Sequence, residues 1–165
     1  MICKGPDALK NLNMLLTNDY TVMAEGQARY SPMCNEQGGV VDDLIVYKVR
    51  DDCYFIVVNA ANKDKDYAWM RDHQSGDVVF EDISSQVAQL ALQGPKAIDV
   101  LKKVAKEEDI PEKYYTCLLT AWWRHEMHQF QRPVIPGRTE WRFIWLRRMR
   151  LRCGNCSWRP ERTRA

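Results

Sequence analysis

The chain has 165 residues, of which 45% are hydrophobic, and its formal net charge is +2. This length suits one domain with a buried core, and no stretch is apolar enough over a sufficient length to cross a bilayer or to act as a secretory signal. The small net charge hides two unlike parts, because residues 117–165 hold 11 arginines, no lysine and only 3 glutamates. Such an asymmetry normally indicates that the basic part contacts nucleic acid or a membrane surface.

Cysteine usage indicates a reducing compartment. Cys3, Cys34 and Cys53 stand alone in apolar or strand-like surroundings, which is typical of reduced thiols in a cytoplasmic protein. Cys153 and Cys156 have the spacing of half a zinc site, but no second pair of ligands accompanies them. We therefore expect a cytoplasmic protein without a metal site.

The first elements are a helix and a hairpin. Gly5-Pro6-Asp7 predicts a helix start, because proline is favoured in the first turn, and leucines follow at helical spacing as far as Leu16. Gly38-Gly39 predicts a hairpin turn between two strands. We expect the second strand of this hairpin over residues 40–49 and a third strand over residues 53–59.

The next elements are shorter. Asn62 is placed to cap a helix over residues 63–73. Short strands are expected over residues 77–81 and 87–92, and Gly94-Pro95-Lys96 then begins another helix.

The pattern G-P-x-A occurs twice, at Gly5 and at Gly94, each time before an amphipathic helix. It indicates either a good helix start used twice or a duplicated strand–helix unit. Helices on one face of a mostly antiparallel sheet fit the order of elements, so the predicted fold class is α+β.

Two acidic residues, Asp42 and Asp43, interrupt an apolar strand. Successive side chains of a strand face opposite sides, so the two carboxylates cannot share one face. Val41, Ile45 and Tyr47 are expected on the face of Asp43. The residues alone leave two interpretations open: a solvated strand end after a turn, or a carboxylate in the wall of a cofactor site.

Several segments resemble one known family in their order and spacing. They are K-G-P-D-A-L (4–9), L-L-T-N-D (15–19), M-C-N-E (33–36), G-G-V-V-D-D-L-I-V-Y (38–47), V-V-N-A-A-N (57–62) and A-L-Q-G-P (91–95). Together they resemble the folate-binding portion of T-protein, the aminomethyltransferase of the glycine cleavage system, from about residue 4 to residue 116. The resemblance implies a partial folate-binding domain over residues 1–116.

The resemblance also implies site residues and a reaction. It places the catalytic carboxylate at Asp43 and folate contacts at Tyr30, Tyr47 and Asn59. The implied reaction moves a one-carbon unit from an aminomethyl-lipoyl group on H-protein to tetrahydrofolate and releases ammonia. Such a transfer needs the reacting atoms held close together and a negative charge beside them, and Asp43 is the candidate for that charge.

After Thr116 the resemblance stops. Reading the codons of residues 132–140 out of frame permits T-G-Y-T-G-E-D-G, the glutamate motif that the family would show next. We therefore interpret residues 117–165 as an Arg/Trp-rich tail produced by a frameshift, with irregular or disordered structure. The chain is then an impaired fragment of the enzyme, with H-protein and folate as expected partners and neither a specific nucleic acid nor a membrane.

Two alternatives from other classes remain. One is a folate-binding module without transferase activity. The other is a basic nucleic-acid-binding protein that acts through residues 147–152, which hold four arginines, and through Trp141, Trp145 and Trp158.

Overall fold

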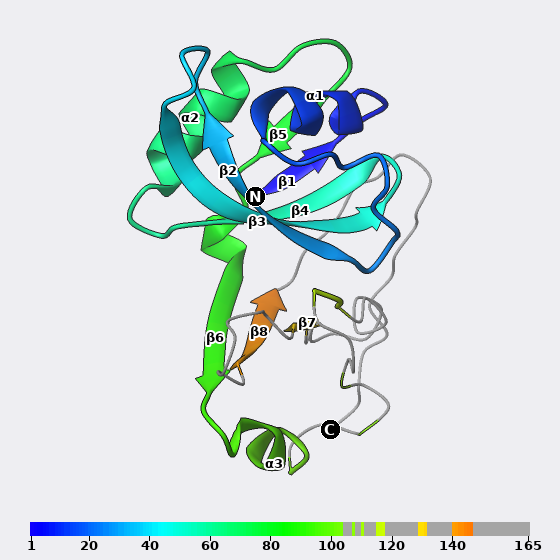
Figure 1. Ribbon diagram of the computed structural model, residues 1–165, viewed down its shortest axis with the longest axis vertical. Helices are drawn as coiled ribbons and strands as arrows, with labels where there is room; N and C mark the ends of the chain where they lie inside the picture. Colours follow the sequence, from blue (N-terminus) through cyan, green and yellow to red (C-terminus); the bar gives the residue numbers. More distant parts are fainter. Residues whose placement is uncertain (104–106, 108–109, 111–114, 118–128, 132–139, 147–165) are drawn as a thin grey trace, which may run out of the picture.

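The computed structural model describes residues 1–103, 107, 110, 115–117, 129–131 and 140–146 (Figure 1). The elements in chain order are β1 (Ile2–Lys4), α1 (Ala8–Leu15), β2 (Ala28–Cys34), β3 (Val40–Arg50), β4 (Cys53–Val58), α2 (Lys63–Asp72), β5 (Val79–Glu81), a short 3-10 helix η1 (Ser84–Gln86), β6 (Val87–Gln93), α3 (Ala97–Leu101), β7 (Gln129–Gln131) and β8 (Glu140–Leu146).

Two antiparallel sheets organise the chain. The first has five strands in the order β2-β3-β4-β1-β5, and every neighbouring pair in it is antiparallel. The second has the order β6-β8-β7, and β6 leads away from the first sheet towards α3 (Figure 1). The predicted α+β class with a mostly antiparallel sheet is confirmed.

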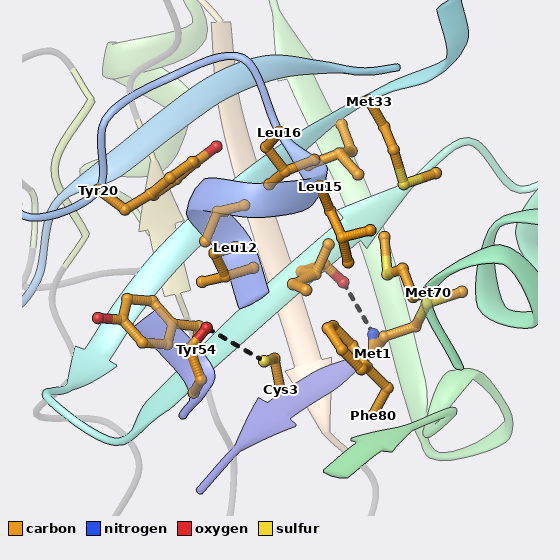
Figure 2. Packing of buried hydrophobic residues seen from close by; sticks show 14 of the residues in the cluster. Met1, Cys3, Leu12, Leu15, Leu16, Tyr20, Met33, Tyr54, Met70 and Phe80 are labelled. Atoms are coloured by element: carbon orange, nitrogen blue, oxygen red, sulfur yellow. Dashed lines mark hydrogen bonds between the residues drawn. The ribbon is translucent and has the colours of Figure 1, made fainter. Parts of the chain in front are cut away.

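Helices α1 and α2 cover one face of the five-stranded sheet. Leu12 of α1, Met33 of β2 and Met70 of α2 are at most 1% exposed and belong to one apolar cluster (Figure 2). Leu44 and Val46 reach the same cluster from β3. Full burial of one such side chain contributes about 1.5–3 kcal/mol, so this cluster fixes which face of β3 points at the helices.

The opposite face of the sheet carries a second apolar cluster, which includes Ile45, Tyr47 and Phe55. Tyr115 packs against this cluster, and its carbonyl oxygen accepts a hydrogen bond from the Ala28 N–H at 2.7 Å. Over residues 44–47 the side chains of β3 therefore alternate regularly between the two faces of the sheet. Even-numbered residues point towards the helices and odd-numbered residues point away from them.

The β2–β3 hairpin turns at Gly38, whose φ of +79° is favoured by glycine. Its register shifts between Met33 and Cys34, so that Asp42 pairs with Met33 while Val40 pairs with Cys34. One residue, Val41, is thereby extra. It packs against the helix-side cluster, so its expected place beside Ile45 is wrong, because a bulge breaks the alternation at this point.

The two G-P-x-A segments have the same local structure. Gly5 and Gly94 have φ values of +131° and +116°, and each accepts a hydrogen bond at 3.0 Å from the alanine three residues later. Each follows a strand and precedes a helix. The likeness fits either origin of the repeat, since both give a strand followed by the same helix start.

Part of the expected tail forms strands. β8 pairs with β6 from Val87 opposite Leu146 to Gln93 opposite Glu140, and β7 pairs with β8. Regular pairing thus occurs at residues 129–131 and 140–146, within the stretch for which irregular structure was expected. The arginines of residues 147–152 and Trp158 lie outside the described residues. None of the helices in the described part of the chain is apolar and long enough to span a membrane.

Candidate active site

Asp43 lies near the N-terminal end of β3, on the sheet face that carries Ile45 and Tyr47. Its strand position is fixed by pairing with Pro32 on one side, while the adjacent Leu44 pairs with Val58 on the other. The carboxyl is half-buried. It therefore stands at the edge of an apolar surface, where a charge is less screened than in bulk water.

Tyr30 reaches Asp43 from the neighbouring strand β2. The Tyr30 hydroxyl donates a hydrogen bond to Oδ2 of Asp43. This bond to the carboxylate is the main reason that the pKa of Tyr30 is raised above its ordinary value. Tyr30 remains 45% exposed, so it is accessible to a ligand.

Asn59 follows β4 and approaches Asp43 from the other side. Its Nδ2 lies 2.8 Å from Oδ1 of Asp43 and 2.9 Å from Oδ1 of Asp42. One amide group thus donates to both acidic side chains, although they leave opposite faces of the strand. The Asp43 carboxylate is held between the Tyr30 hydroxyl and the Asn59 amide.

Tyr47 lies farther along the same face of β3. Its ring is fully buried against Phe55, with ring centroids 6.0 Å apart and planes inclined by 56°, an edge-tilted packing that aromatic pairs favour. The structure therefore brings Tyr30, Asp43 and Asn59 into direct contact and places Tyr47 in the buried apolar cluster beside them.

Asp42 faces the helices and is only 8% exposed. Its Oδ1 accepts hydrogen bonds from the Asp43 N–H and from Asn59, both at 2.9 Å, and its Oδ2 accepts one from Asn62 at 2.9 Å. Burial disfavours the charge of Asp42, but the hydrogen bonds from Asp66, Asn62, Asp43 and Asn59 together hold its pKa well below its usual range. Asp42 is thus an ionised carboxylate whose charge is stabilised by hydrogen bonds from the protein. It lies directly behind the candidate site.

Asn62 does not cap α2 through its side chain as expected. It occupies the N-cap position, but no cap hydrogen bond forms, because its amide donates to Asp42 instead. The sequence gives no signal that Asn62 bonds to Asp42 and does not cap the helix, since Asp42 lies 20 residues earlier.

Asp66 is the site neighbour that sequence reasoning missed. It lies on α2 with its side chain fully buried, and burial, followed by the hydrogen bond to Asp42 and the charge of Asp42, raises its pKa to about 6. A K-D-K-D run normally indicates a solvated helix face, so only the packing of α2 on β3 reveals this contact. Among the described residues, no group of three or more His, Cys, Asp or Glu side chains is arranged to hold a metal ion.

This geometry offers a ligand a fixed negative charge, an amide and an exposed aromatic ring at the edge of an apolar surface. A comparison with protein families matches residues 1–130 to the GCVT N-terminal domain. The chain belongs to this family. The resemblance read from the sequence is thereby confirmed for the N-terminal, folate-binding portion of T-protein.

Curated proteins and solved structures agree with this family. The chain is 50% identical over 107 residues to the aminomethyltransferase of Shouchella clausii and 51% identical over 108 residues to that of Bacillus licheniformis, matches that cover 65% and 66% of this chain. The crystal structure of glycine cleavage system aminomethyltransferase T from Bartonella henselae matches with a TM-score of 0.73 at 26% identity, over 88% of this chain and 38% of that one.

The chain spans only 29% of the length of each of these two curated relatives. The family and its fold are therefore shown for this portion. The activity of a whole aminomethyltransferase, its substrates and its partners come to this chain only as proposals.

Proposed function

We propose that this chain carries the folate-facing carboxylate of an aminomethyltransferase, with Asp43 as the catalytic residue and Tyr30, Tyr47 and Asn59 as tetrahydrofolate contacts. The observation that carries the proposal is the contact of Asp43 with both Tyr30 and Asn59 on one sheet face. The family match supports the chemistry, because relatives with about half of the aligned residues identical are aminomethyltransferases.

The residues present fit a pterin. A flat heterocycle with amine and carbonyl edges would lie beside the exposed Tyr30 ring, at the edge of the buried apolar cluster that holds Ile45 and Tyr47, and meet polar groups only at its rim. The Asn59 side-chain oxygen can accept a hydrogen bond from such an edge, since its N–H groups donate to Asp42 and Asp43, and the exposed Tyr30 ring offers a stacking surface. Tetrahydrofolate would supply the amine that accepts the one-carbon unit.

The role of Asp43 follows from its surroundings. Tyr30 and Asn59 fix the carboxylate before a ligand arrives, so no reorganisation is needed when positive charge develops beside it. The same oxygens can accept a proton released from the folate amine. Tyr30 and Asn59 therefore orient the charge, and Asp43 stabilises the reacting atoms.

Turnover by this chain alone is proposed to be weak or absent, because the glutamate motif that the family would show after Thr116 is replaced by the Arg/Trp-rich residues 117–165. In the complete reaction the donor would be an aminomethyl group on the lipoyl arm of H-protein, with ammonia as the leaving group. A non-catalytic folate-binding module is the second candidate, and the replacement of the same motif favours it. The two candidates share the folate site and differ only in turnover.

Titration of tetrahydrofolate against the protein and its Asp43→Asn variant tests the site. Loss of the charge should weaken binding about tenfold or more, because a hydrogen bond to a charged group contributes about 1.5–3 kcal/mol. Glu36→Gln is the matched control, since Glu36 is exposed in the turn of the same hairpin. Equal affinity of the protein and Asp43→Asn would refute the assignment, and turnover of aminomethyl-lipoyl H-protein at a normal enzyme rate would refute the impaired fragment.

The boundary at residue 116 and the frameshift origin of residues 117–165 are also proposals. The abrupt change in composition after Thr116 and the permitted T-G-Y-T-G-E-D-G support them, whereas the family match runs on to residue 130. Sequencing the encoding DNA decides the matter. A second frame that does not encode the glutamate motif would end the frameshift hypothesis.

A further inference from the structure

Asp66 is a buried acid whose ion-pair partner, Lys65, is half exposed. The Asp66 side chain is 0% exposed, although aspartate is almost never fully buried unless paired. Neither of its carboxyl oxygens accepts a hydrogen bond from a donor that the described residues supply. Lys65 Nζ lies 3.4 Å from Asp66 Oδ1, but it donates its hydrogen bond to the carbonyl oxygen of Val41.

The Asp42 carboxyl is the acidic group that acts on Asp66, and as carboxylates the two have no hydrogen between them, so they can form a hydrogen bond only when one of them is protonated. Two carboxyl groups in contact cannot both be ionised without strong repulsion, so they share one proton. Asp42 already accepts three hydrogen bonds from N–H groups, whereas Asp66 accepts none. The proton therefore resides on Asp66, and its O–H donates to Asp42.

We propose that Asp66 is a positioning residue, which as a carboxylic acid fixes Asp42 and, through the Asn59 amide, orients the Asp43 carboxylate. The path consists of three contacts: Asp66 to Asp42, Asp42 to Asn59 at 2.9 Å, and Asn59 to Asp43 at 2.8 Å. The functional consequence of this inference rests on the proposed folate site. The orientation of Asn59 by Asp66 is independent of it.

Ionisation of Asp66 would reverse its effect. A second negative charge would then face Asp42, and the O–H donor that fixes Asp42 would be lost, so the Asn59 amide would lose its fixed partner. Burial, followed by the hydrogen bond to Asp42 and the charge of Asp42, raises the pKa of Asp66 to about 6, so the proton is held in mildly acidic solution and is lost as the pH rises towards 8.

The other charged groups around α2 are engaged elsewhere. On the β5 side, Glu81 forms an ion pair with Lys4 at 2.8 Å, and Asp82 lies 3.9 Å from Lys63. The charges that act on Asp66 are therefore those of Asp42 from β3 and Lys65 from its own helix. The Asp42 charge raises the pKa of Asp66 and the Lys65 charge lowers it.

The test compares Asp66→Asn with Asp66→Leu. The asparagine keeps an N–H donor for Asp42 and cannot ionise, whereas the leucine keeps most of the volume and has no donor. The first readout is the NMR signal of the Asn59 side-chain amide, assigned with Asn59→Gln and followed from pH 5 to 8. The signal should titrate near pH 6 in the unmodified chain, stay constant in Asp66→Asn, and be shifted at every pH in Asp66→Leu.

The second readout is tetrahydrofolate affinity over the same pH range. Asp66→Leu should weaken binding about tenfold, Asp66→Asn should restore it, and the unmodified chain should bind more weakly at pH 8 than at pH 5. Asp64→Asn is the matched control, because Asp64 lies on the same helix with its side chain 87% exposed.

The outcomes separate the two proposals. An Asn59 amide signal that is the same in Asp66→Leu and in the unmodified chain, without titration, overturns the positioning role. No folate binding by the unmodified chain refutes the proposed function, and the amide signal then still decides whether Asp66 positions Asn59.

Discussion

The side-chain amide of Asn59 is hydrogen-bonded to the carboxylate of Asp43 at 2.8 Å, across the pair of strands β3 and β4. The contact exists because Leu44 pairs with Val58, which places the residue after β4 opposite the residue before Leu44. A two-residue change of register would separate the two groups by more than the reach of an asparagine. The candidate site therefore depends on the register of the sheet.

Asn59→Asp should weaken tetrahydrofolate binding about tenfold or more, because it replaces a donor with an acceptor between two carboxylates. It should also destabilise the fold by about 1–3 kcal/mol above pH 5, through repulsion with Asp42 and Asp43. Folate titration and chemical unfolding measure the two effects.

Asn13→Asp is the control for that change. The Asn13 side-chain oxygen accepts a hydrogen bond from the Tyr20 N–H at 2.8 Å, and an aspartate oxygen can accept the same bond. Its effect on folate affinity should be negligible. An equal loss of affinity in both variants would contradict the role of Asn59.

Tyr30→Phe removes the hydroxyl that donates to Asp43 but leaves the exposed ring in place. Folate affinity should fall by about tenfold or less, since stacking is retained and one hydrogen bond to a charged group is lost. Tyr67→Phe on α2, which packs on the opposite face of the sheet, should leave affinity unchanged. Unchanged affinity in Tyr30→Phe would show that the hydroxyl does not orient Asp43 for binding.

Stability should depend on pH through Asp66. Its pKa is about 6 in the folded chain against an ordinary 3.8, so its stabilising contribution is complete below about pH 4 and is lost as the pH rises through about 6. The free energy of unfolding should fall by about 1–3 kcal/mol from this group between pH 5 and 8. Urea unfolding at several pH values measures the change.

Asp66→Asn should abolish this fall, because the titrating carboxyl is absent, and leave the opposite trend of the Met1 amino group, whose pKa burial lowers to about 6 so that stability rises with pH. Asp42 also acts in the direction opposite to Asp66. Its lowered pKa stabilises the fold above about pH 4 and should cause a loss of stability in more acidic solution. A fall in stability between pH 5 and 8 that survives in Asp66→Asn would show that another group causes it.

Gly5→Ala should destabilise the fold more than Gly38→Ala. A Cβ at Gly5 would lie 2.4 Å from the carbonyl oxygen of Asp77, in a backbone conformation with φ of +131°, whereas a Cβ at Gly38 meets nothing within 4 Å. Both changes cost backbone strain of about 1–3 kcal/mol, and only the first adds a collision with backbone. Thermal unfolding of the two variants gives the comparison, and equal losses would contradict it.

The order of elements followed from the sequence because it depends on local signals. The helix after Gly5, the turn at Gly38 and the helix after Asn62 lie where spacing and turn residues predict them. Boundaries moved by a residue or two, as hydrogen bonds at element ends depend on their surroundings. The bulge that redirects Val41 had no local signal, because it arises from pairing with a different strand.

The candidate site could be predicted only in part from the sequence. Tyr30, Asp43, Tyr47 and Asn59 were named through a family resemblance, and their residue types alone favoured core packing or a solvated strand end. Asp66 was missed because a charged helix in sequence gives no indication of which of its carboxylates is buried.

The sequence by itself determined the antiparallel α+β arrangement and the family, since hydrophobic periodicity, turn residues and matched segments are properties of short stretches. Only the tertiary structure decided that Tyr30 and Asn59 hold the same carboxylate and that Asp66 is buried behind it with its pKa raised by Asp42. The reason is physical: those contacts join strands and a helix that are 13 to 24 residues apart in the chain, and the protonation of a buried acid depends on what surrounds it in space.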